Sequence, residues 1–296
     1  MARARVEPDA AGARVDHMVA AAVPGLSIAA ARRLVEGGAV RVDGRPARKG
    51  ARLAAGQIVE VDDAAIAARR PGVVPDPDLA LDVLYSDDTL VAIAKPPGVP
   101  SHPLAGKRTG TAASALAARF PECAAASPDP REGGLVHRLD TATSGVLVAA
   151  RSAPAWPALR AALGDPDAEK TYLAEVAGAP PAHGVADQPI GRVGRRGDRV
   201  RVGGGRQPLA ARTEWEVLER RDDRTLVRVR LDAGRAHQVR AHLAAAGFPI
   251  VGDPKYGGPE AQELHLHAAS VRFRHPVSGE LISITAPPPP WAIIRA

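Results

Sequence analysis

The sequence predicts an α+β protein, in which a mixed, largely antiparallel β-sheet carries flanking helices and loops. Short runs with an alternating or Val-rich pattern, typical of strands, recur throughout residues 79–296. Helical patterns in this region are few, and they do not follow the strands in the regular succession of a parallel α/β sheet. A small unit of two helices and a hairpin is expected before the sheet, and 296 residues suffice for both.

The small unit is expected at residues 12–62, after a loose tail of residues 1–11. Apolar residues at helical spacing follow the tail, and a second helix is expected after Ser27, whose hydroxyl suits an N-cap. The turn pair Asp43-Gly44 between two Val-containing runs predicts a hairpin. Two helices and a hairpin therefore complete this unit.

Positive charge is a second feature of the small unit. The chain carries a net charge of +6 and has a pI of about 10.0, which fits a polyanion partner, nucleic acid before an anionic membrane. Between Ser27 and Arg52 seven basic residues face two acids. The seven are Arg32, Arg33, Arg41, Arg45, Arg48, Lys49 and Arg52. The charge alone fits an RNA-binding face and a merely solvated basic face equally well.

Residues 63–78 are expected to form an extended linker, because prolines stand at positions 71, 75 and 77. The large domain is therefore placed at residues 79–296. A single cysteine excludes an internal disulfide framework and a cysteine metal cluster. Neither a membrane span nor a secretion signal is recognisable, so a cytoplasmic protein, expected to be a monomer, is predicted.

The stretch from Gly133 to Arg151 organises the large domain. Two short apolar runs, each expected to be a buried strand, flank a polar loop that contains Arg138 and Asp140. A carboxylate beside an arginine stays ionised and oriented, which suits a nucleophile. The alternative is an ordinary ion pair at the end of a strand.

Two further patterns bear on chemistry. Residues 191–212 carry seven arginines against one acid and are expected to be a flexible cationic loop, either for phosphate contact or merely solvated. His265-x-His267 is interpreted as a hydrogen-bonded histidine pair, because no second cluster of metal ligands accompanies it. The glycine-rich loops that bind dinucleotides or phosphates are absent from the sequence.

Several motifs together resemble the RluA family of pseudouridine synthases, and residues 12–62 resemble the S4 RNA-binding domain. The motifs are H-R-L-D-x-x-T-S-G (137–145), K-x-Y-x-A-x-V-x-G (170–178), G-R-x-H-Q-x-R-x-H-L (234–243), G-D-P-K-Y-G (252–257), L-H-A (266–268) and K-P-P-G (95–98).

The resemblance implies an RNA-uridine isomerase that needs no cofactor and no metal. Asp140 would be the nucleophile, Arg240 would hold it charged, and Tyr172 would pack on the uracil and take part in proton transfer. Arg138 would fill the gap that the flipped uridine leaves, since a planar guanidinium replaces stacking. The remaining residues expected to bind RNA or substrate are His137, Thr143, Arg235, His237, Arg32, Arg33 and Arg41.

The resemblance also implies a partner, which is RNA. Ribosomal RNA of the large subunit is expected before transfer RNA. The alternatives are a non-enzymatic RNA-binding or ribosome-assembly factor and another RNA-modifying enzyme such as a methyltransferase, whose cofactor loop the sequence lacks. Departures from the family pattern, such as Ala94 before K-P-P-G, touch none of the three residues at the expected reaction centre.

Overall fold

The computed structural model describes residues 2–23, 26–69, 72–104, 108–194, 199–232 and 234–294. It divides into two compact units, Met1–Gly72 with Pro128–Arg131, and Val73–Ser127 with Glu132–Ala296. No helix in the described part of the chain is long and apolar enough to cross a membrane.

The smaller unit packs two helices against a four-stranded sheet. Its elements are β1 (Ala2–Arg5), α1 (Val15–Ala22), α2 (Ile28–Glu36), β2 (Val40–Val42), β3 (Arg45–Pro46), β4 (Ile58–Val61) and α3 (Asp63–Arg69), with a 3-10 turn at Pro8–Ala10. Ser27 caps α2 by accepting a hydrogen bond from the Ala30 amide. Both turn residues of the hairpin, Asp43 and Gly44, have positive φ, as a two-residue hairpin turn requires.

Two predictions for this part of the chain are wrong. The tail contains a strand, because β1 pairs antiparallel along the whole of β4 and places Ala2 opposite Val61. The expected linker begins with helix α3, and Asp63 in its first turn accepts a hydrogen bond from the Ala2 amide. Pro71, one of the prolines that suggested an extended linker, lies outside the described residues.

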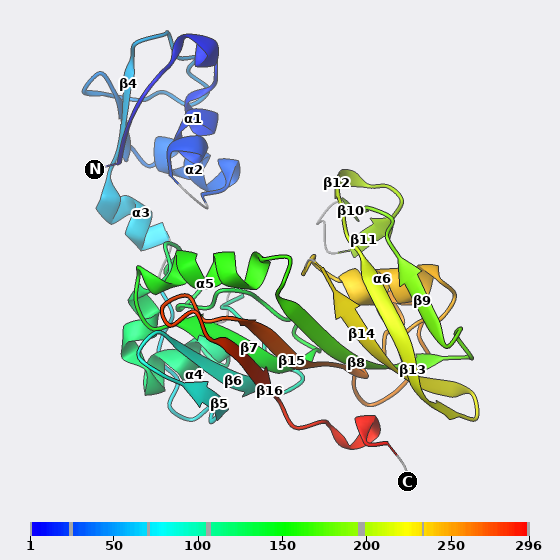
Figure 1. Ribbon diagram of the computed structural model, residues 1–296. Coiled ribbons are helices and arrows are strands. Elements are labelled where there is room, and N and C mark those ends of the chain that lie inside the picture. Colours follow the sequence, from blue (N-terminus) through cyan, green and yellow to red (C-terminus); the bar gives the residue numbers. More distant parts are fainter. Residues whose placement is uncertain are drawn as a thin grey trace. The chain divides into compact units, whose positions relative to one another are not determined.

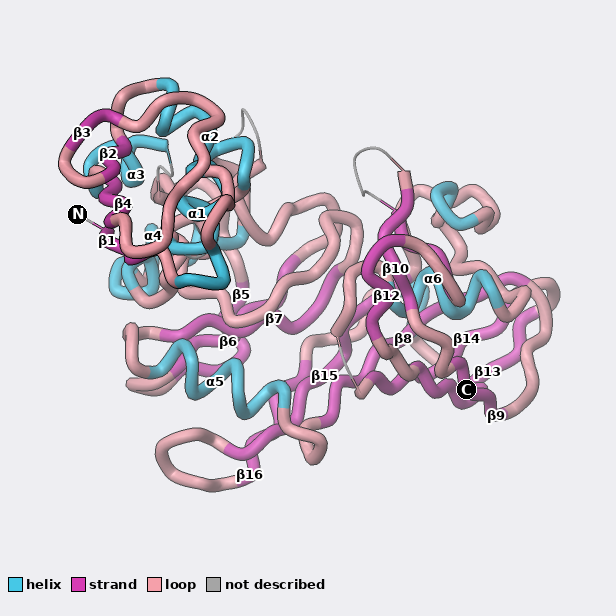
Figure 2. Tube along the Cα trace, turned by 90° about the horizontal axis from the view of Figure 1, so that it is seen from above, coloured by secondary structure: helices cyan, strands magenta, loops and turns pink. Residues whose placement is uncertain are grey.

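The larger unit is built on a nine-stranded sheet (Figure 1). Its strands, in spatial order, are β5 (Asp82–Ser86), β6 (Leu90–Lys95), β7 (Ser144–Ala150), β15 (Leu266–Arg274), β8 (Glu169–Ala177), β14 (Arg224–Leu231), β13 (Thr213–Arg221) and β9 (His183–Ala186), with β16 (Leu281–Thr285) paired to β15. Every neighbouring pair is antiparallel except β7 and β15, so the predicted mixed, largely antiparallel sheet is confirmed. Figure 2 shows β15 between β7 and β8.

Helices cover both faces of the first half of this sheet. Every residue of β7 is buried, with Val146 and Val148 packing in the core that includes α5 (Ala155–Gly164), and Leu147 and Ala149 in the core that includes α4 (Ala112–Arg119). A strand buried on both faces reads as a continuous apolar run, as this one does. Helix α6 (Gln238–Ala245) packs with β13 and β14 in a third core. The 3-10 turns lie at Pro121–Ala125, Pro254–Tyr256 and Pro290–Ala292.

Three predictions for the larger unit are wrong in detail. Leu135 and Val136 form no strand; Leu135 makes a single bridge to Ala149. The expected helix from residue 234 begins only at Gln238. The expected cationic loop folds into a small sheet of β10 (Ile190–Val193), β11 (Arg199–Val202) and β12 (Arg206–Leu209), although Arg195 and Arg196 of that stretch lie outside the described residues.

Candidate active site

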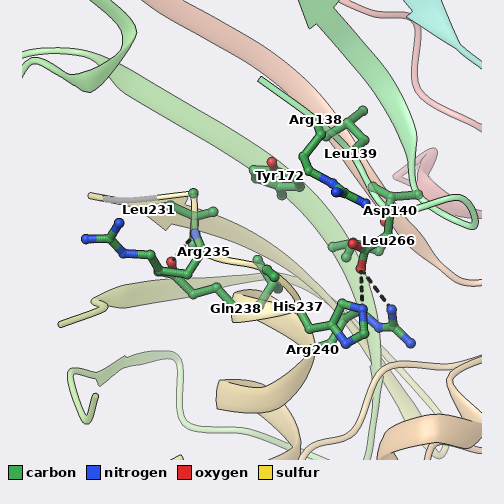
Figure 3. A pocket seen from close by; sticks show the side chains of 14 residues that line it. Arg138, Leu139, Asp140, Tyr172, Leu231, Arg235, His237, Gln238, Arg240 and Leu266 are labelled. Atoms are coloured by element: carbon green, nitrogen blue, oxygen red, sulfur yellow. Dashed lines mark hydrogen bonds and ion pairs between the residues drawn. The ribbon is translucent and has the colours of Figure 1, made fainter. Parts of the chain in front are cut away.

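A pocket opens where the two halves of the large sheet meet (Figure 3). Its walls come from the loop before β7, from β8, from the chain between β14 and α6, and from β15. Seven residues expected at the site line it together: Arg138, Asp140, Thr143, Tyr172, Arg235, His237 and Arg240. The parallel step from β7 to β15 therefore brings together motifs that are about a hundred residues apart.

Buried polar groups hold the Asp140 loop in place. The ammonium of Lys95, which is 1% exposed, donates hydrogen bonds to the carbonyls of Pro96, Val99 and Thr141 at 2.9, 2.7 and 3.1 Å. Burial lowers the pKa of Lys95 to about 8, opposed by the negative charge of Asp140.

A serine anchors the other side of the same loop. The Ser101 hydroxyl accepts from the amide of Leu139 at 3.0 Å and donates to its carbonyl at 2.8 Å. Both neighbours of Asp140 are thereby fixed to the segment that follows β6, so little backbone freedom remains to the carboxylate.

One guanidinium joins two carboxylates beneath the pocket. Arg240 donates from Nε and Nη2 to both carboxylate oxygens of Asp253, at 2.7 and 2.8 Å, and from Nη1 to Oδ2 of Asp140 at 2.8 Å. Asp253 is 1% exposed, so this bidentate pair fixes the plane of the guanidinium. Although burial opposes the charge, the hydrogen bonds to Asp253 and Asp140 raise the pKa of Arg240. The ion pair predicted between Asp140 and Arg240 is thus present.

A histidine approaches the same carboxylate oxygen. Nε2 of His237 lies 3.6 Å from Oδ2 of Asp140 (Figure 3). Its Nδ1 is hydrogen-bonded to the Tyr256 hydroxyl at 2.9 Å. Oδ1 of Asp140 makes no hydrogen bond with the residues that the structure describes. Burial, followed by the nearby charge of Asp140, raises the pKa of Tyr172, so its phenol stays neutral. The carboxylate in the pocket wall therefore has one oxygen held by Arg240 and one without a hydrogen bond from the described residues.

Arg138 has a different environment from Arg240. Its side chain is exposed, and it makes no ion pair with any described residue. The expected division between the two arginines, with Arg240 and not Arg138 against the carboxylate, agrees with this geometry.

His137 does not line the pocket, although the sequence suggested it. Its Nε2 accepts a hydrogen bond from the amide of Val148 in β7 at 3.1 Å. The ring thereby takes the place of a backbone acceptor, because residues 135 and 136 form no strand beside β7. Burial lowers the pKa of His137 to about 3, so the ring is a neutral acceptor. The interactions seen for His137 support the backbone of β7.

The three remaining predicted residues, Arg32, Arg33 and Arg41, belong to the smaller unit. Arg32 donates from Nε to buried Asp16 at 3.1 Å, and Arg14 pairs with the same carboxylate through two hydrogen bonds of 2.9 Å. The hydrogen bond from Arg14 lowers the pKa of Asp16 to about 2, against its burial. One buried acid thus orients two half-exposed guanidinium groups.

The sequence interpretation missed several residues of the site. Lys95, Asp253 and Tyr256 stand in the motifs K-P-P-G and G-D-P-K-Y-G, but their spacing alone did not indicate a place beside Asp140. The motif resemblance was the one signal that pointed to them.

The two histidines of the 265–267 pattern have separate partners. His265 bonds Glu175 at 2.7 Å, and His267 bonds the Ser144 hydroxyl at 2.9 Å. Among the described residues, no three side chains of His, Cys, Asp or Glu gather as metal ligands would.

The chain belongs to the RNA pseudouridylate synthase family, whose model matches residues 89–245, and the S4 domain model matches residues 13–59. It is 40% identical to the ribosomal large subunit pseudouridine synthase D of Xanthomonas campestris, over 97% of this chain and 89% of the relative. It is 39% identical to an uncharacterised RNA pseudouridine synthase of Chloroflexus aurantiacus, over 96% and 89%. The solved human RNA pseudouridylate synthase domain containing 1 is similar in fold, with TM-score 0.59 and 25% identity over 74% of this chain and 89% of that one.

The protein is therefore an RNA pseudouridine synthase, an isomerase with an S4 domain at its N-terminal end. The comparisons give no support to a non-enzymatic assembly factor.

Proposed function

We propose that this enzyme converts specific uridines of large-subunit ribosomal RNA to pseudouridine, with Asp140 as the nucleophile. The observation that carries the proposal is the carboxylate of Asp140 in the pocket wall, whose Oδ2 is held by Arg240 while Oδ1 has no hydrogen bond from the described residues. The names of relatives such as the Xanthomonas protein support the ribosomal target.

The chemistry is an isomerisation in which no atom is lost. The bond between N1 of the uracil and the ribose breaks, a bond from carbon 5 forms in its place, and the proton of carbon 5 leaves as N1 gains one. Because the reaction is redox-neutral, side chains alone account for it. Oδ1 of Asp140 adds to the uridine, and the bond that it forms breaks again by the time carbon 5 has joined the ribose, which restores the carboxylate. The fixed positive charge of Arg240 keeps the carboxylate ionised before it adds.

Tyr172 and Arg138 serve the flipped nucleotide in this proposal. Tyr172 remains a neutral phenol, which suits packing on the uracil, and its hydroxyl relays the proton of carbon 5 rather than removing it unaided. Arg138, exposed beside the pocket, occupies the place vacated in the RNA and replaces part of the lost stacking. Thr143, Arg235 and His237 complete the walls of the uridine site.

The smaller unit supplies affinity for RNA in this proposal. Arg32, Arg33 and Arg41 contact phosphates, and residues 12–62 act as one RNA-binding domain before the catalytic domain. We propose further that the enzyme works as a monomer in the cytoplasm. Replacement of Arg32 and Arg41 by Gln should weaken RNA binding at all sequences and reduce its salt dependence, because phosphate contacts carry no sequence information.

The decisive experiment replaces Asp140 by Asn. Cells that lack the protein are complemented with wild type or variant, and pseudouridine is mapped in their ribosomal and transfer RNA. Asp140→Asn should abolish conversion of the target uridines while the purified variant still binds the RNA. A matched control is Asp223→Asn, because that side chain is 86% exposed and its one ion pair with a residue in the described part of the chain is to Arg224, at 3.7 Å. Conversion by the Asp140 variant at the wild-type level would refute the assignment.

A further inference from the structure

Tyr256 lies beside the pocket but does not line it, and it connects the nucleophile to the small cationic sheet. Its hydroxyl accepts a hydrogen bond from the amide of Val200 in β11 at 3.0 Å and bonds Nδ1 of His237 at 2.9 Å. The guanidinium groups of Arg199 and Arg240 lie over its ring at 5.5 and 5.3 Å from the centroid. Four groups thus meet on one side chain.

The two hydrogen bonds of this hydroxyl constrain its proton. A phenol has one proton to donate, and a backbone amide can only donate, so the amide of Val200 uses a lone pair of Tyr256. The proton of Tyr256 is then available to Nδ1 of His237. When Nδ1 accepts it, the ring proton of a neutral histidine must reside on Nε2.

The carboxylate favours the same tautomer. Nε2 of His237 faces Oδ2 of Asp140 at 3.6 Å, where a lone pair would be repelled and an N–H is attracted. Burial lowers the pKa of His237, although the charge of Asp140 opposes this shift, so the ring is neutral and its tautomer decides which nitrogen carries the proton. Long hydrogen bonds at catalytic groups of a free enzyme often shorten when the substrate binds. The contact between His237 and Asp140 can shorten in this way, because Arg240 already fixes the same carboxylate oxygen.

The strained backbone conformation of His237 is consistent with a functional role for this residue. Its φ is +54°, in the left-handed region that a residue with a side chain adopts at a conformational cost. The observed direction of the ring toward Asp140 depends on this conformation at the start of α6.

We propose that Tyr256 is a positioning residue, whose hydroxyl fixes His237 as the Nε2–H tautomer so that His237 and Arg240 both hold Oδ2 of Asp140 and leave Oδ1 for the uridine. The inference rests on the proposed role of Asp140. Because Val200 belongs to β11, the arginine-bearing sheet is tied to the nucleophile through Tyr256 and His237.

The first test is Tyr256→Phe, which keeps the ring over both guanidinium groups and removes only the hydroxyl. We expect kcat for pseudouridine formation to fall about tenfold with the affinity for RNA unchanged, the effect of one lost orienting hydrogen bond. Tyr85→Phe is the matched control, since that hydroxyl bonds Asp87 and does not reach the pocket. A kcat within twofold of wild type for Tyr256→Phe would overturn the proposal.

A double variant separates action through His237 from an independent effect. His237→Asn is chosen because asparagine tolerates the left-handed backbone. In that background Tyr256→Phe should lower kcat no further, because the hydroxyl has lost the group through which it acts. If the fold-reductions in kcat of the two single variants multiply in the double variant, the proposal is contradicted.

The tautomer itself is measured without activity, by 15N NMR of protein labelled at its nine histidines. The His237 signals, identified by their loss in His237→Asn, should show Nε2–H in wild type and a mixture of tautomers in Tyr256→Phe. An Nδ1–H tautomer in wild type, or no change on substitution, would overturn the proposal. A wild-type protein that makes no pseudouridine would instead refute the proposed function and leave the tautomer result standing.

Discussion

Replacement of Asp253 by Asn tests whether the buried pair beneath the pocket stabilises the enzyme. The amide keeps the size of the carboxylate, but it offers one acceptor oxygen where Arg240 donates from both Nε and Nη2 at 2.7 and 2.8 Å. The amide nitrogen then turns its own hydrogens toward the second guanidinium N–H. Arg240, which is 8% exposed, keeps its positive charge and loses its principal counter-ion.

The expected cost follows from these contacts. A hydrogen bond to a charged group contributes about 1.5–3 kcal/mol, and breaking a buried ion pair costs about 3–5 kcal/mol. Because Asp140 remains as a partner at 2.8 Å, we expect the free energy of unfolding of the larger unit to fall by about 3 kcal/mol, the lower end of that range. Released from Asp253, the guanidinium is also free to take both oxygens of Asp140, so kcat should fall at least about tenfold.

Urea unfolding followed by tryptophan fluorescence measures this change. The three tryptophans, Trp156, Trp215 and Trp291, all belong to the larger unit, so the signal reports that unit alone. Asp223→Asn is the matched control and should change the free energy by less than about 0.5 kcal/mol, because its ion pair is exposed. A loss below about 1 kcal/mol for Asp253→Asn, with wild-type conversion of RNA, would show that the bidentate pair neither stabilises the unit nor orients Arg240.

Three further predictions concern the frame around the site. Lys95→Met removes the donor to the carbonyls of Pro96, Val99 and Thr141, of which the last keeps a hydrogen bond from the Gly98 amide, and should lower the free energy of unfolding by about 2–4 kcal/mol in the same urea experiment; an unchanged midpoint would contradict it. Gly145→Ala places a Cβ 2.1 Å from the carbonyl oxygen of Ala268, at a φ of +116°, so the parallel pairing of β7 with β15 should fail. The free energy of unfolding of the larger unit should then fall by at least about 4 kcal/mol, and a variant with wild-type stability would be incompatible with this pairing. The pKa of His137 falls from 6.5 to about 3 on folding, so the unfolded chain binds more protons between these values and stability should decrease as the pH drops below 6.5. His137→Gln should reduce this dependence of stability on pH when urea midpoints are compared at pH 7, 6 and 5. A dependence equal to that of wild type would show that His137 does not cause it.

Local patterns in the sequence were sufficient for much of the fold. The N-cap at Ser27 and the turn pair Asp43-Gly44 each depend on side-chain chemistry within a few residues, and both are confirmed. The short Val-rich run before Arg151 likewise indicated a buried strand, and every residue of β7 is buried.

Elements stabilised by distant partners were missed. β1 has the sequence A-R-A-R and becomes a strand only because β4 offers a free edge. Strands β10 to β12 have only four residues each and lie in an arginine- and glycine-rich stretch, so their sequence resembled a loop although β11 alternates Arg and Val.

The candidate site was predictable in its residue types but only partly in its contacts. The resemblance of motifs pointed to Asp140 and Arg240 and to their pairing. Burial and contacts that no spacing encodes decide the rest: Asp253 holds Arg240, Lys95 holds the loop, and His137 is turned toward the Val148 amide. A motif indicates that a histidine is important to the fold or the site, whereas the surrounding packing determines which.

The position of β15 in the sheet has a consequence for synthesis on the ribosome. It is among the last strands to be made, yet it is inserted between β7 and β8, so β5, β6 and β7 have no link through the sheet to β8, β14 and β13 before it emerges. Asp140 belongs to the first group and Arg240 to the second. We therefore expect Asp140 to lack its counter-ion in the nascent chain until residue 274 has been translated and has left the exit tunnel, and chains that terminate earlier to be inactive.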